Sequence, residues 1–552
     1  MLPDPEKLNK YLYIEKTPTW RVRAIYSFGI FAWLCVVYGF AQVIGIDPFY
    51  TWFDGPLVFL FSIYTLSSFA LNLTYKQFDI KKHNTVLHEY WAAHHVEPSL
   101  DVFLPICGED LDILENTWLH VSRLNYANKK VYVLDDSKEL QSEHKRLAEK
   151  YGFTYLERPN KGEMKKAGNL KYGYQHSSGE FILILDADFA PRHDLVHELL
   201  PYMANPKIAI VQSPQYFGAG VHLKGRTNLE YTAAYAEEPF YRFIQVTRDR
   251  FDASICCGSN AIYRRKALEE IGGPVQVEQS EDARTGFAVS SKGWKVRYVP
   301  IILAIGLCPD DTHAYFHQQH RWCTGSMQLM LSKEFWQAPV PWSMKFCYCT
   351  GFMFYLHFPL TILFSFQLFW ALFFYNQYIS IANAILFYPN VLFIIFYFSF
   401  FPLVRFRFGY LRTMLTQTYA YSHAVVSAFL NNAVGWIPTN SKRSVVSKAF
   451  HQATWAISIY VFIYSMLLAL AVRSQKVHVF SYNYYSVQFW LFFNLTISCF
   501  LLWEMYRTME RSYEERVAQN ALSKTDFLRW QLKTAGLYTV LLTAVFMGIV
   551  WL

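Results

Sequence analysis

The sequence predicts an α/β domain inserted into an α-helical transmembrane bundle of about seven spans with interfacial helices. The 552 residues are 53% hydrophobic and 18% aromatic, a composition typical of membrane proteins. Long stretches without a charged residue lie on both sides of a polar block at about 96–330. Within this block, short apolar runs alternate with helix-like stretches, which predicts a sheet covered by helices.

Uncharged stretches provide seven candidate spans, because a bilayer core needs about 20 apolar helical residues. Two precede the polar block, one between Arg23 and Asp47 and one between Asp54 and Lys76. The stretch Phe346–Val404 is long enough for two passes. Three more spans are predicted at Ala449–Val472, Val477–Trp503 and Thr534–Leu552.

The chain is therefore expected to have three parts: a tail with two spans at 1–95, the α/β domain at 96–330, and interfacial helices with about five spans at 331–552. Lysines and arginines collect in the tail, in the polar block and beside later spans. By the positive-inside rule these parts face the cytoplasm, which places the C-terminus outside. Met327–Lys345 and Thr413–Ser441 are expected to lie on the membrane surface.

Charge and cysteine usage argue against two other classes of protein. The net charge of +8 fits a membrane protein with basic cytoplasmic segments, and no array of basic and aromatic residues indicates nucleic-acid binding. Nine cysteines are scattered along the chain, with no set of C-x-x-C pairs at the spacing of a zinc site.

Four short apolar runs predict the strands of the α/β domain. Helical stretches such as Ser142–Tyr151 separate them, so the sheet is expected to be parallel and doubly wound. Ligands bind beyond the carboxyl ends of such strands, and three of these runs end there in acidic or polar residues. The runs are Asp101–Pro105, Lys130–Leu134, Phe181–Leu185 and Ile208–Gln212.

Asp186 and Asp188 flank Ala187 at the end of the third run. Carboxylate oxygens on a tight turn suit Mg²⁺ or Mn²⁺, which commonly shares its other positions with waters and a diphosphate. A lone DxD is most often a solvated turn. The strand before it and the motifs after it favour a metal site here.

Two further motifs lie where a nucleotide is expected. Asp135-Asp136 follows the second run and can accept hydrogen bonds from a base or ribose, although a capping pair would look the same. Lys165–Leu170 offers cations and a glycine-permitted backbone approach to a phosphate, and a solvated basic turn is the alternative. Nucleotide binding is the interpretation that unites them.

Asp282 follows Ser280 and Glu281 at the predicted start of a helix over Ala283–Lys292. Helix amides can hold such a carboxylate, and it can accept the proton of an attacking hydroxyl. An acidic N-terminal cap is the alternative interpretation.

Gln318-Gln319-His320-Arg321-Trp322 comes just before the next uncharged stretch. Arg321 can pair bidentately with a diphosphate, and Trp322 offers a flat face for a sugar ring or an anchor for the membrane interface. Trp436–Lys442 interrupts a later uncharged region with Pro, Thr and Lys. It is interpreted either as a loop that reaches phosphates or as a plain interfacial turn.

In this order the motifs resemble those of family 2 processive glycosyltransferases of the cellulose synthase superfamily, from about Asp101 to Ser444. The segments that carry the resemblance, each with the family motif it is similar to, are Asp101–Glu109 (VDVxxPTYNE), Asp135–Ser137 (DDG), Lys166–Leu170 (KAGNL), Asp186–Asp188 (DAD), Val211–Pro214 (VQTP), Cys257–Ser259 (CGS), Ser280–Asp282 (TED), Gln318–Trp322 (QxxRW) and Trp436–Thr439 (FxVT).

The resemblance implies a GT-A-like, Rossmann-like domain that polymerises glucose from UDP-glucose into a β-glucan and translocates it. It implies Mg²⁺ or Mn²⁺ on Asp186 and Asp188, and Asp282 with Glu281 as the catalytic pair. It also implies membrane lipids as surroundings, a gating loop at 434–445, and acceptor contacts at Cys257, Gly258 and Trp322. The implied UDP-sugar contacts are Glu109, Asp135, Asp136, Lys166, Asp186, Gln318, Arg321, Thr439 and Lys442.

Departures from the family pattern keep alternatives open. Gln319 stands where bacterial cellulose synthases usually have an arginine, and the C-terminal segment is expected to be too short for a cyclic-di-GMP-binding domain. A hyaluronan or chitin synthase using a UDP-N-acetylhexosamine is one alternative, and a non-processive lipid glycosyltransferase is another. A transporter or scaffold that merely retains the domain is a third, although uncharged spans argue against an ion pathway.

Overall fold

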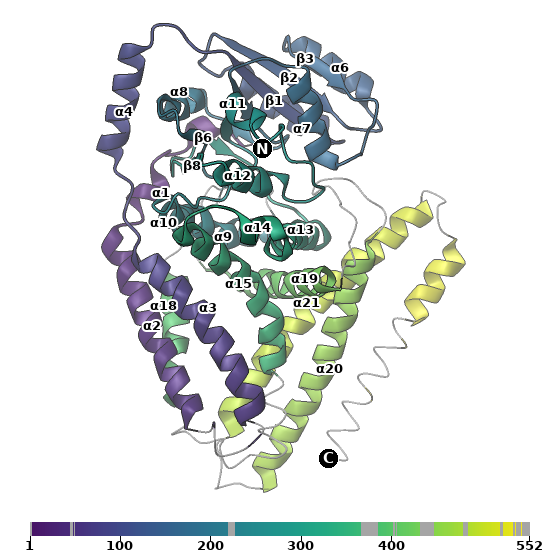
Figure 1. Ribbon diagram of the computed structural model, residues 1–552. Helices are drawn as coiled ribbons and strands as arrows, with labels where there is room; N and C mark the ends of the chain where they lie inside the picture. Colours follow the sequence, from purple (N-terminus) through teal and green to yellow (C-terminus); the bar gives the residue numbers. More distant parts are fainter. Residues whose placement is uncertain are drawn as a thin grey trace.

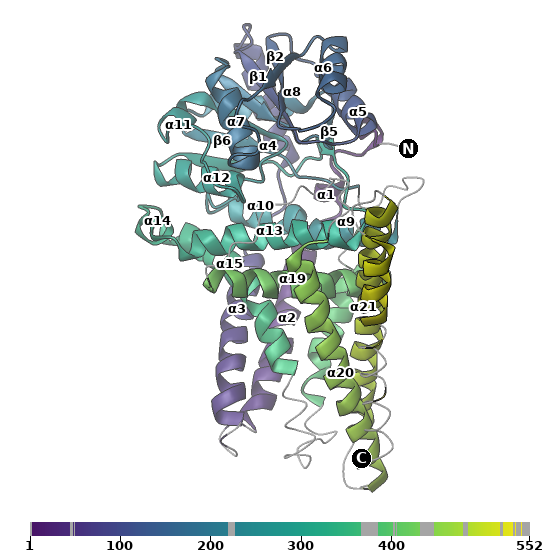
Figure 2. The same ribbon diagram turned by 90° about the vertical axis from the view of Figure 1, so that its right-hand side faces the viewer.

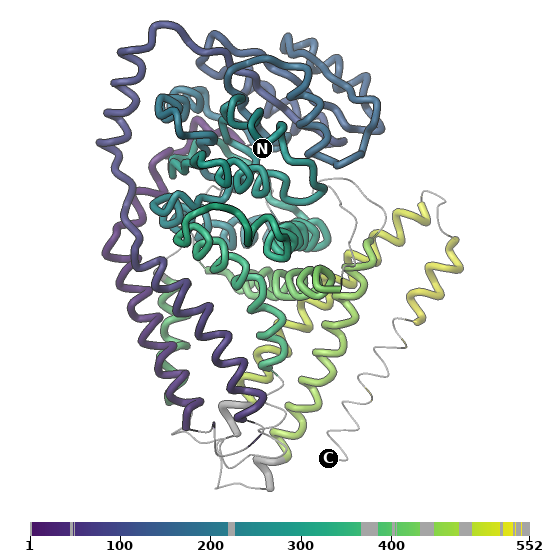
Figure 3. Tube along the Cα trace, in the orientation of Figure 1, coloured from purple at the N-terminus to yellow at the C-terminus, as the bar shows by residue number. Residues whose placement is uncertain are grey.

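A computed structural model shows an α/β domain at one end of the molecule and a bundle of long helices at the other (Figure 1). After a quarter turn, α13 and α19 are seen to lie across the junction between the two (Figure 2). The tube in Figure 3 follows the chain from the first two long helices into the α/β domain and back into the bundle. The structure describes residues 3–42, 44, 48, 50–218, 227–365, 385–400, 403, 406–430, 446–477, 484–518, 523–533, 536 and 543.

A seven-stranded mixed sheet forms the centre of the α/β domain. Its strands lie in the order β3 (Thr154–Glu157), β2 (Lys129–Asp135), β1 (Leu100–Ile106), β4 (Phe181–Ile184), β7 (Ala261–Arg264), β6 (Ile208–Gln212) and β8 (Lys295–Tyr298). All neighbouring strands are parallel except β7, which runs antiparallel to both β4 and β6. The four predicted strands and the α/β class are confirmed.

The expectation of a wholly parallel sheet is corrected by β7. This strand has four residues and lies between Asn260 and Arg265, so its apolar signal is too short to stand out in the sequence. It joins β4 to β6 in the middle of the sheet and places Cys257–Ser259, just before it, near the end of β4. Ser259 Oγ accepts a hydrogen bond of 2.9 Å from the Asp186 N–H there.

Helices cover both faces of the sheet, which explains the continuous apolar runs of the strands. Val102 and Leu104 of β1 pack in the same cluster as Trp118 of α5 (Leu111–Ser122). Phe103, which points the other way, packs in a cluster with Leu170 of α7 (Lys165–Gln175). The central strands are therefore buried on both sides, and their carboxyl ends are left for a ligand.

Five described helices are long and apolar enough to cross a membrane. They are α2 (Thr19–Ala41), η2 with α3 (Tyr50–Leu73), α15 (Trp342–Ser365), α20 over Lys448–Arg473 and α21 over Gln488–Ala518. Of the other two predicted spans, the second pass within 346–404 is described only as α18 (Tyr388–Phe400) and the last lies almost wholly outside the described residues. The helix α21 continues past Trp503, where that span was expected to end.

Two helices lie across the ends of these spans (Figure 2). One is α13 (Thr312–Leu331), whose N-terminus is capped by Asp311, which accepts a 2.8 Å hydrogen bond from the Ala314 N–H. The other is α19 (Gly409–Phe429), which packs against α13 and forms the described part of the predicted surface segment Thr413–Ser441.

The predicted surface helix Met327–Lys345 is corrected in its boundaries. Its first part is the end of α13, and α14 (Lys333–Gln337) follows after a break at Ser332. Pro339 and Pro341 then separate α14 from α15, because proline cannot continue a helix from the preceding turn. Gln318–Trp322 thus lies within the transverse helix instead of before it.

A buried ion pair ties the N-terminal segment to the rest of the molecule. Arg242 in η4 (Phe240–Ile244) donates from Nη1 to Glu238 Oε1 at 2.6 Å and from Nε to Thr17 Oγ1 at 2.5 Å. Glu238, at the end of α9 (Asn228–Pro239), also accepts from the Leu403 N–H at 3.1 Å. Three distant parts of the chain therefore meet at one pair of charges.

Arg242→Met is expected to lower the free energy of unfolding by about 3–5 kcal/mol, because it leaves the buried Glu238 carboxylate without its charged partner. Thermal or denaturant unfolding of the detergent-solubilised protein measures the change. The matched control is Lys150→Met, which removes an exposed ion pair with Glu115 and should leave stability essentially unchanged. Equal losses in the two variants would contradict the role assigned to the buried pair.

Candidate active site

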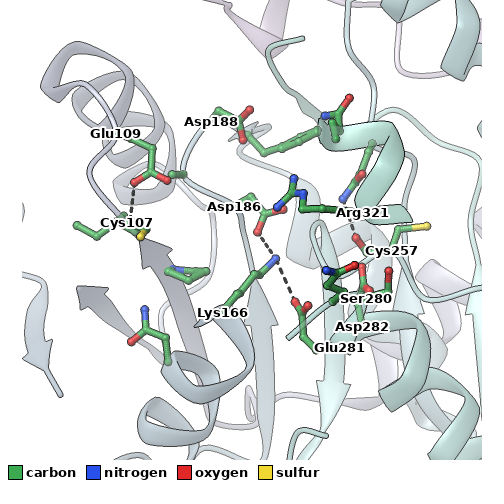
Figure 4. Close-up of a pocket in the computed structure, with 18 of the residues that line it drawn as sticks. Cys107, Glu109, Lys166, Asp186, Asp188, Cys257, Ser280, Glu281, Asp282 and Arg321 are labelled. Atoms are coloured by element: carbon green, nitrogen blue, oxygen red, sulfur yellow. Dashed lines mark hydrogen bonds and ion pairs between the residues drawn. The ribbon is translucent and has the colours of Figure 1, made fainter. Parts of the chain in front are cut away.

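One pocket collects most of the predicted site residues at the carboxyl ends of β1 and β4 (Figure 4). Its walls come from the loop after β1, the start of α7, the turn after β4, the start of α12 (Glu281–Ser291) and the middle of α13. The predicted residues that line it are Glu109, Asp136, Lys166, Asp186, Asp188, Cys257, Glu281, Asp282, Gln318, Arg321 and Trp322.

Asp282 is held at the first turn of α12, as the sequence predicts. Its Oδ1 accepts a 2.7 Å hydrogen bond from the N–H of Ala283. Gly258 has a φ of +77°, and a Cβ there would lie 2.7 Å from Asp282 Oδ2, so only glycine fits against this carboxylate. Burial, and then the neighbouring Glu281 carboxylate, raise the Asp282 pKa to about 7.

Lys166 connects the two acidic walls of the pocket. It is in the first turn of α7, where Nζ forms an ion pair with Asp186 Oδ1 and lies 3.8 Å from Glu281 Oε1 (Figure 4). Burial opposes its charge, but the carboxylates of Asp186, Glu281 and Asp282 outweigh burial and raise the Lys166 pKa. The lysine therefore stays protonated between the predicted base and the predicted metal ligands.

Asp188 lies on the far side of Asp186, near Glu109 (Figure 4). Burial, followed by repulsion from Asp186, raises the Asp188 pKa to about 7. Glu109 accepts a 2.6 Å hydrogen bond from the Cys107 N–H, and burial raises its pKa. Like charges crowded out of water are under-compensated here, and this favours a cation at the Asp186–Asp188 pair.

Within the described part of the chain, no three His, Cys, Asp or Glu side chains are arranged to hold a metal ion. Two carboxylates nevertheless suit Mg²⁺ or Mn²⁺, because such ions commonly take their remaining oxygens from phosphates and water. Asp186 and Asp188 therefore fit an ion that is bound together with a nucleoside diphosphate.

The helix α13 closes the pocket on the side of the spans. Gln318, Arg321 and Trp322 reach the lining from it, and Gly325 lies one turn further along. A Cβ on Gly325 would collide with the Ser280 side chain, so glycine allows α13 to lie directly on the Ser280–Asp282 turn. Ser280 has a φ of +53°, and this left-handed backbone conformation turns the chain into α12.

Asp135 and Asp136 take different positions. Asp136 lines the pocket, but both of its oxygens accept from Arg158, at 2.7 and 2.8 Å. Asp135 is not among the lining residues. Its carboxylate accepts from Tyr155 at 2.6 Å and from the Ser137 N–H at 2.7 Å, and it lies 3.0 Å from His144 Nδ1.

Arg158 is a residue that the sequence did not single out. It is 1% exposed, and beyond Asp136 it donates to the carbonyl oxygens of Glu163 and Lys165, at 2.6 and 3.2 Å. These carbonyls belong to the turn in which Met164 and Lys165 have positive φ. Arg158 thus holds the turn that presents Lys166.

Other lining residues were also missed, among them Gln215 and Gln279. Each adjoins a recognised motif, since Gln215 follows Val211–Pro214 and Gln279 precedes Ser280–Asp282. Their position next to a recognised motif is the sequence signal that could have identified Gln215 and Gln279. Gly258 lies behind Asp282, and Thr439 and Lys442 lie outside the described residues.

Comparison with known proteins gives similarities for the α/β domain. Residues 101–272 match the model of glycosyl transferase family 2. A cellulose synthase catalytic subunit of Komagataeibacter xylinus, named as UDP-forming, is 36% identical over 235 residues, which cover 42% of this chain and 31% of that protein. Its counterpart from Pseudomonas fluorescens (strain SBW25) is 28% identical over 264 residues, covering 47% and 35%. The chain thus spans about a third of the length of these relatives.

Among solved structures, the mannosyltransferase PcManGT from Pyrobaculum calidifontis with GDP-Man and Mn²⁺ aligns with a TM-score of 0.48 and 16% identity, covering 69% of this chain and all of that one. The family model covers the predicted motifs from Asp101–Glu109 to Cys257–Ser259 and ends before Ser280–Asp282. Residues 101–272 are therefore similar to family 2 glycosyltransferases, and just under half of the chain is similar to cellulose synthases.

Proposed function

We propose that the protein is a membrane-embedded, inverting glycosyltransferase that polymerises glucose from UDP-glucose into a β-glucan and translocates the product. The observation that carries the proposal is the position of Asp282. Its carboxylate shares one pocket with Asp186, Asp188 and Trp322. The helix that carries Trp322, α13, lies across the junction between the α/β domain and the candidate spans (Figure 2).

In the proposed reaction Asp282 accepts the proton of an acceptor hydroxyl. The hydroxyl oxygen forms a bond to the anomeric carbon while the bond from that carbon to the diphosphate breaks, and UDP leaves with the bonding electrons. Attack opposite the leaving group converts the α-linked donor into a β-glycoside. A base with a pKa near the working pH suits this step, because it is ionised yet accepts a proton readily.

Asp186 and Asp188 would hold Mg²⁺ or Mn²⁺ next to the diphosphate. When bound, the ion would neutralise charge on the departing UDP. Lys166 and Arg321 contribute positive charge from the protein, and Gln318 adds an amide for the donor. Glu109 and Asp136 line the pocket and are the proposed contacts to the nucleoside. Asp135, beside Asp136, contacts Tyr155 and His144 and would stabilise this wall of the pocket.

The product is expected to leave past Trp322, on which its terminal ring can stack, and to move between the spans. The α/β domain is placed in the cytoplasm, the spans in the plasma membrane and its lipids, and the C-terminus outside, because basic residues flank the spans on the domain side. Partners are therefore UDP-glucose, the nascent polysaccharide and lipid.

Two other products would fit the same chemistry. A hyaluronan or chitin-type synthase would use a UDP-N-acetylhexosamine, and a lipid glycosyltransferase would give a glycolipid that extracts into organic solvent. Polymer built from UDP-glucose alone separates the proposal from both. Digestion with linkage-specific glucanases then identifies the linkage.

Purified protein with UDP-glucose and Mg²⁺ or Mn²⁺ is expected to release UDP and form a β-glucan. Asp282→Asn should lower both by about 10²- to 10⁴-fold, because it removes the base but keeps the shape of the side chain. Glu278→Gln, an exposed acid four residues earlier, is the matched control and should retain full activity. An active Asp282→Asn protein, or a parent that forms no polymer, would end the proposal.

The pH profile is expected to follow Asp282. Since a base must be ionised, kcat/KM should fall about tenfold per pH unit below about 7 and level off above it. Asp188 has a pKa in the same range, so the profile is measured at low and high Mn²⁺. Protons compete with a metal for its ligands. An acid limb that moves to lower pH with added Mn²⁺ would therefore assign it to Asp188 and not to the base.

Thr439 and Lys442 are expected to close over the bound UDP-sugar as part of the loop 434–445. Thr439→Ala combined with Lys442→Ala should lower turnover strongly and leave membrane insertion unchanged, because closure contributes to the reacting complex. Rates are measured across UDP-glucose concentrations. The matched control is Lys448→Ala, an exposed lysine at the start of α20. If the double variant works at the parental rate, the closing loop is contradicted and Trp436–Lys442 is an interfacial turn.

A further inference from the structure

Gln319 lies in the middle of α13 and is fully buried, yet it is not one of the described residues that line the pocket. Successive side chains of an α-helix diverge by about 100°. Gln318, Arg321 and Trp322 therefore face the pocket together, while Gln319 points toward the helices packed behind α13.

The side-chain amide of Gln319 uses all of its hydrogen-bonding capacity. Nε2 donates to Glu237 Oε1 of α9 at 3.0 Å and to Oε1 of the pocket residue Gln318 at 3.5 Å. Oε1 accepts from Gln417 Nε2 at 3.3 Å and from the Tyr421 hydroxyl, both on α19. Since an amide has two N–H donors and two acceptor lone pairs, the contacts also fix which way the amide is turned.

Three helices meet at this amide. The helix α19 packs against both α13 and α9. The hydroxyl oxygens of Thr232 in α9 and Thr413 in α19 are 2.7 Å apart, so these two helices are hydrogen-bonded to each other as well. One turn after Gln319, Cys323 Sγ lies 3.7 Å from the carbonyl oxygen of Tyr421. The turn of α13 that carries the pocket residues is thus held from behind by two connected helices.

The partners of Gln319 require a donor and an acceptor at the same position. Burial raises the Glu237 pKa to about 7, and the hydrogen bond from Gln319 opposes this rise by favouring the carboxylate. An arginine has five donors and no acceptor, so it would leave Gln417 Nε2 without the oxygen to which it donates. The donors on α19 therefore account for a glutamine at a position where bacterial cellulose synthases usually have an arginine.

We propose that Gln319 is a positioning residue for the pocket, whose amide fixes the rotation of α13 about its own axis and so places Gln318 and Arg321. The inference rests on the proposed function for the reaction used to test it, and it adds a residue outside the pocket to those that determine the rate. A small rotation is sufficient, because a misplacement of about 1 Å can cost a reaction about 10²-fold.

Gln319→Met removes all four hydrogen bonds and keeps the length of the side chain. The Kd of UDP in the presence of Mn²⁺, measured on the detergent-solubilised protein, is expected to rise about tenfold, and kcat with UDP-glucose to fall about tenfold or more, because Arg321 is displaced from the diphosphate. Gln328→Met, at a half-buried glutamine of the same helix, is the matched control and should change neither quantity.

An exchange of the two partners separates positioning from general stability. Gln319→Glu places a second carboxyl group opposite Glu237 and should impair Kd and kcat as Gln319→Met does. Glu237→Gln alone keeps an acceptor for Nε2 and should remain close to the parent. Glu237→Gln combined with Gln319→Glu restores a donor facing an acceptor, with the carboxylate now accepting from α19. This double variant is expected to return both quantities to within about threefold of the parent.

Parental Kd and kcat in Gln319→Met would overturn the inference even if the unfolding temperature falls, because the residue would then only stabilise the fold. If Gln319→Met does not fold, the exchange decides, and a double variant as impaired as Gln319→Glu would overturn the inference too. A parent that binds UDP with Mn²⁺ but does not use UDP-glucose would instead overturn the proposed function, and the Kd values alone would then decide the role of Gln319.

Discussion

Negative charge enclosed at the end of the sheet is the constraint around which the α/β domain is organised. Glu109, Asp186, Asp188, Glu281 and Asp282 share the pocket with only two cationic side chains among the lining residues, Lys166 and Arg321. Carboxylates so close together and removed from water cannot all ionise at ordinary cost. Each element nearby therefore either supplies positive charge, as α7 and α13 do, or donates backbone hydrogen bonds, as the first turn of α12 does.

The two acidic side chains at the end of β2 are paired more completely than the other carboxylates around the pocket. Asp136 is neutralised by a bidentate arginine, and Asp135 is bonded by a tyrosine and a backbone N–H beside a histidine. These side chains are complete without a ligand. The carboxylates that remain under-compensated, Asp188 and Asp282, are the proposed metal ligand and the proposed base. Incomplete pairing therefore distinguishes these two carboxylates from those of Asp135 and Asp136, which protein groups already pair.

Much of this arrangement could be predicted because it depends on local patterns. Buried strands appear as continuous apolar runs, and Asp282 appears as an acid at a helix start. Other features depend on contacts across the fold. Arg158 meets Asp136 across 22 residues and Arg242 meets Thr17 across 225, and no spacing rule connects such pairs. The antiparallel β7 was missed because its four residues carry too little periodicity to be recognised as a strand.

The transverse helix α13 connects the pocket mechanically to the candidate spans. It carries Arg321 and Trp322, lies on the turn of Asp282 through Gly325, and packs on α19, which in turn packs on the spans α15 and α21. Within the described residues, the pocket is thus connected to the candidate spans by helices in direct contact. In the proposed membrane enzyme, bilayer thickness and lateral pressure, which set the tilt of spans, would act on the geometry of the pocket, and lipid composition would be a determinant of the rate of synthesis.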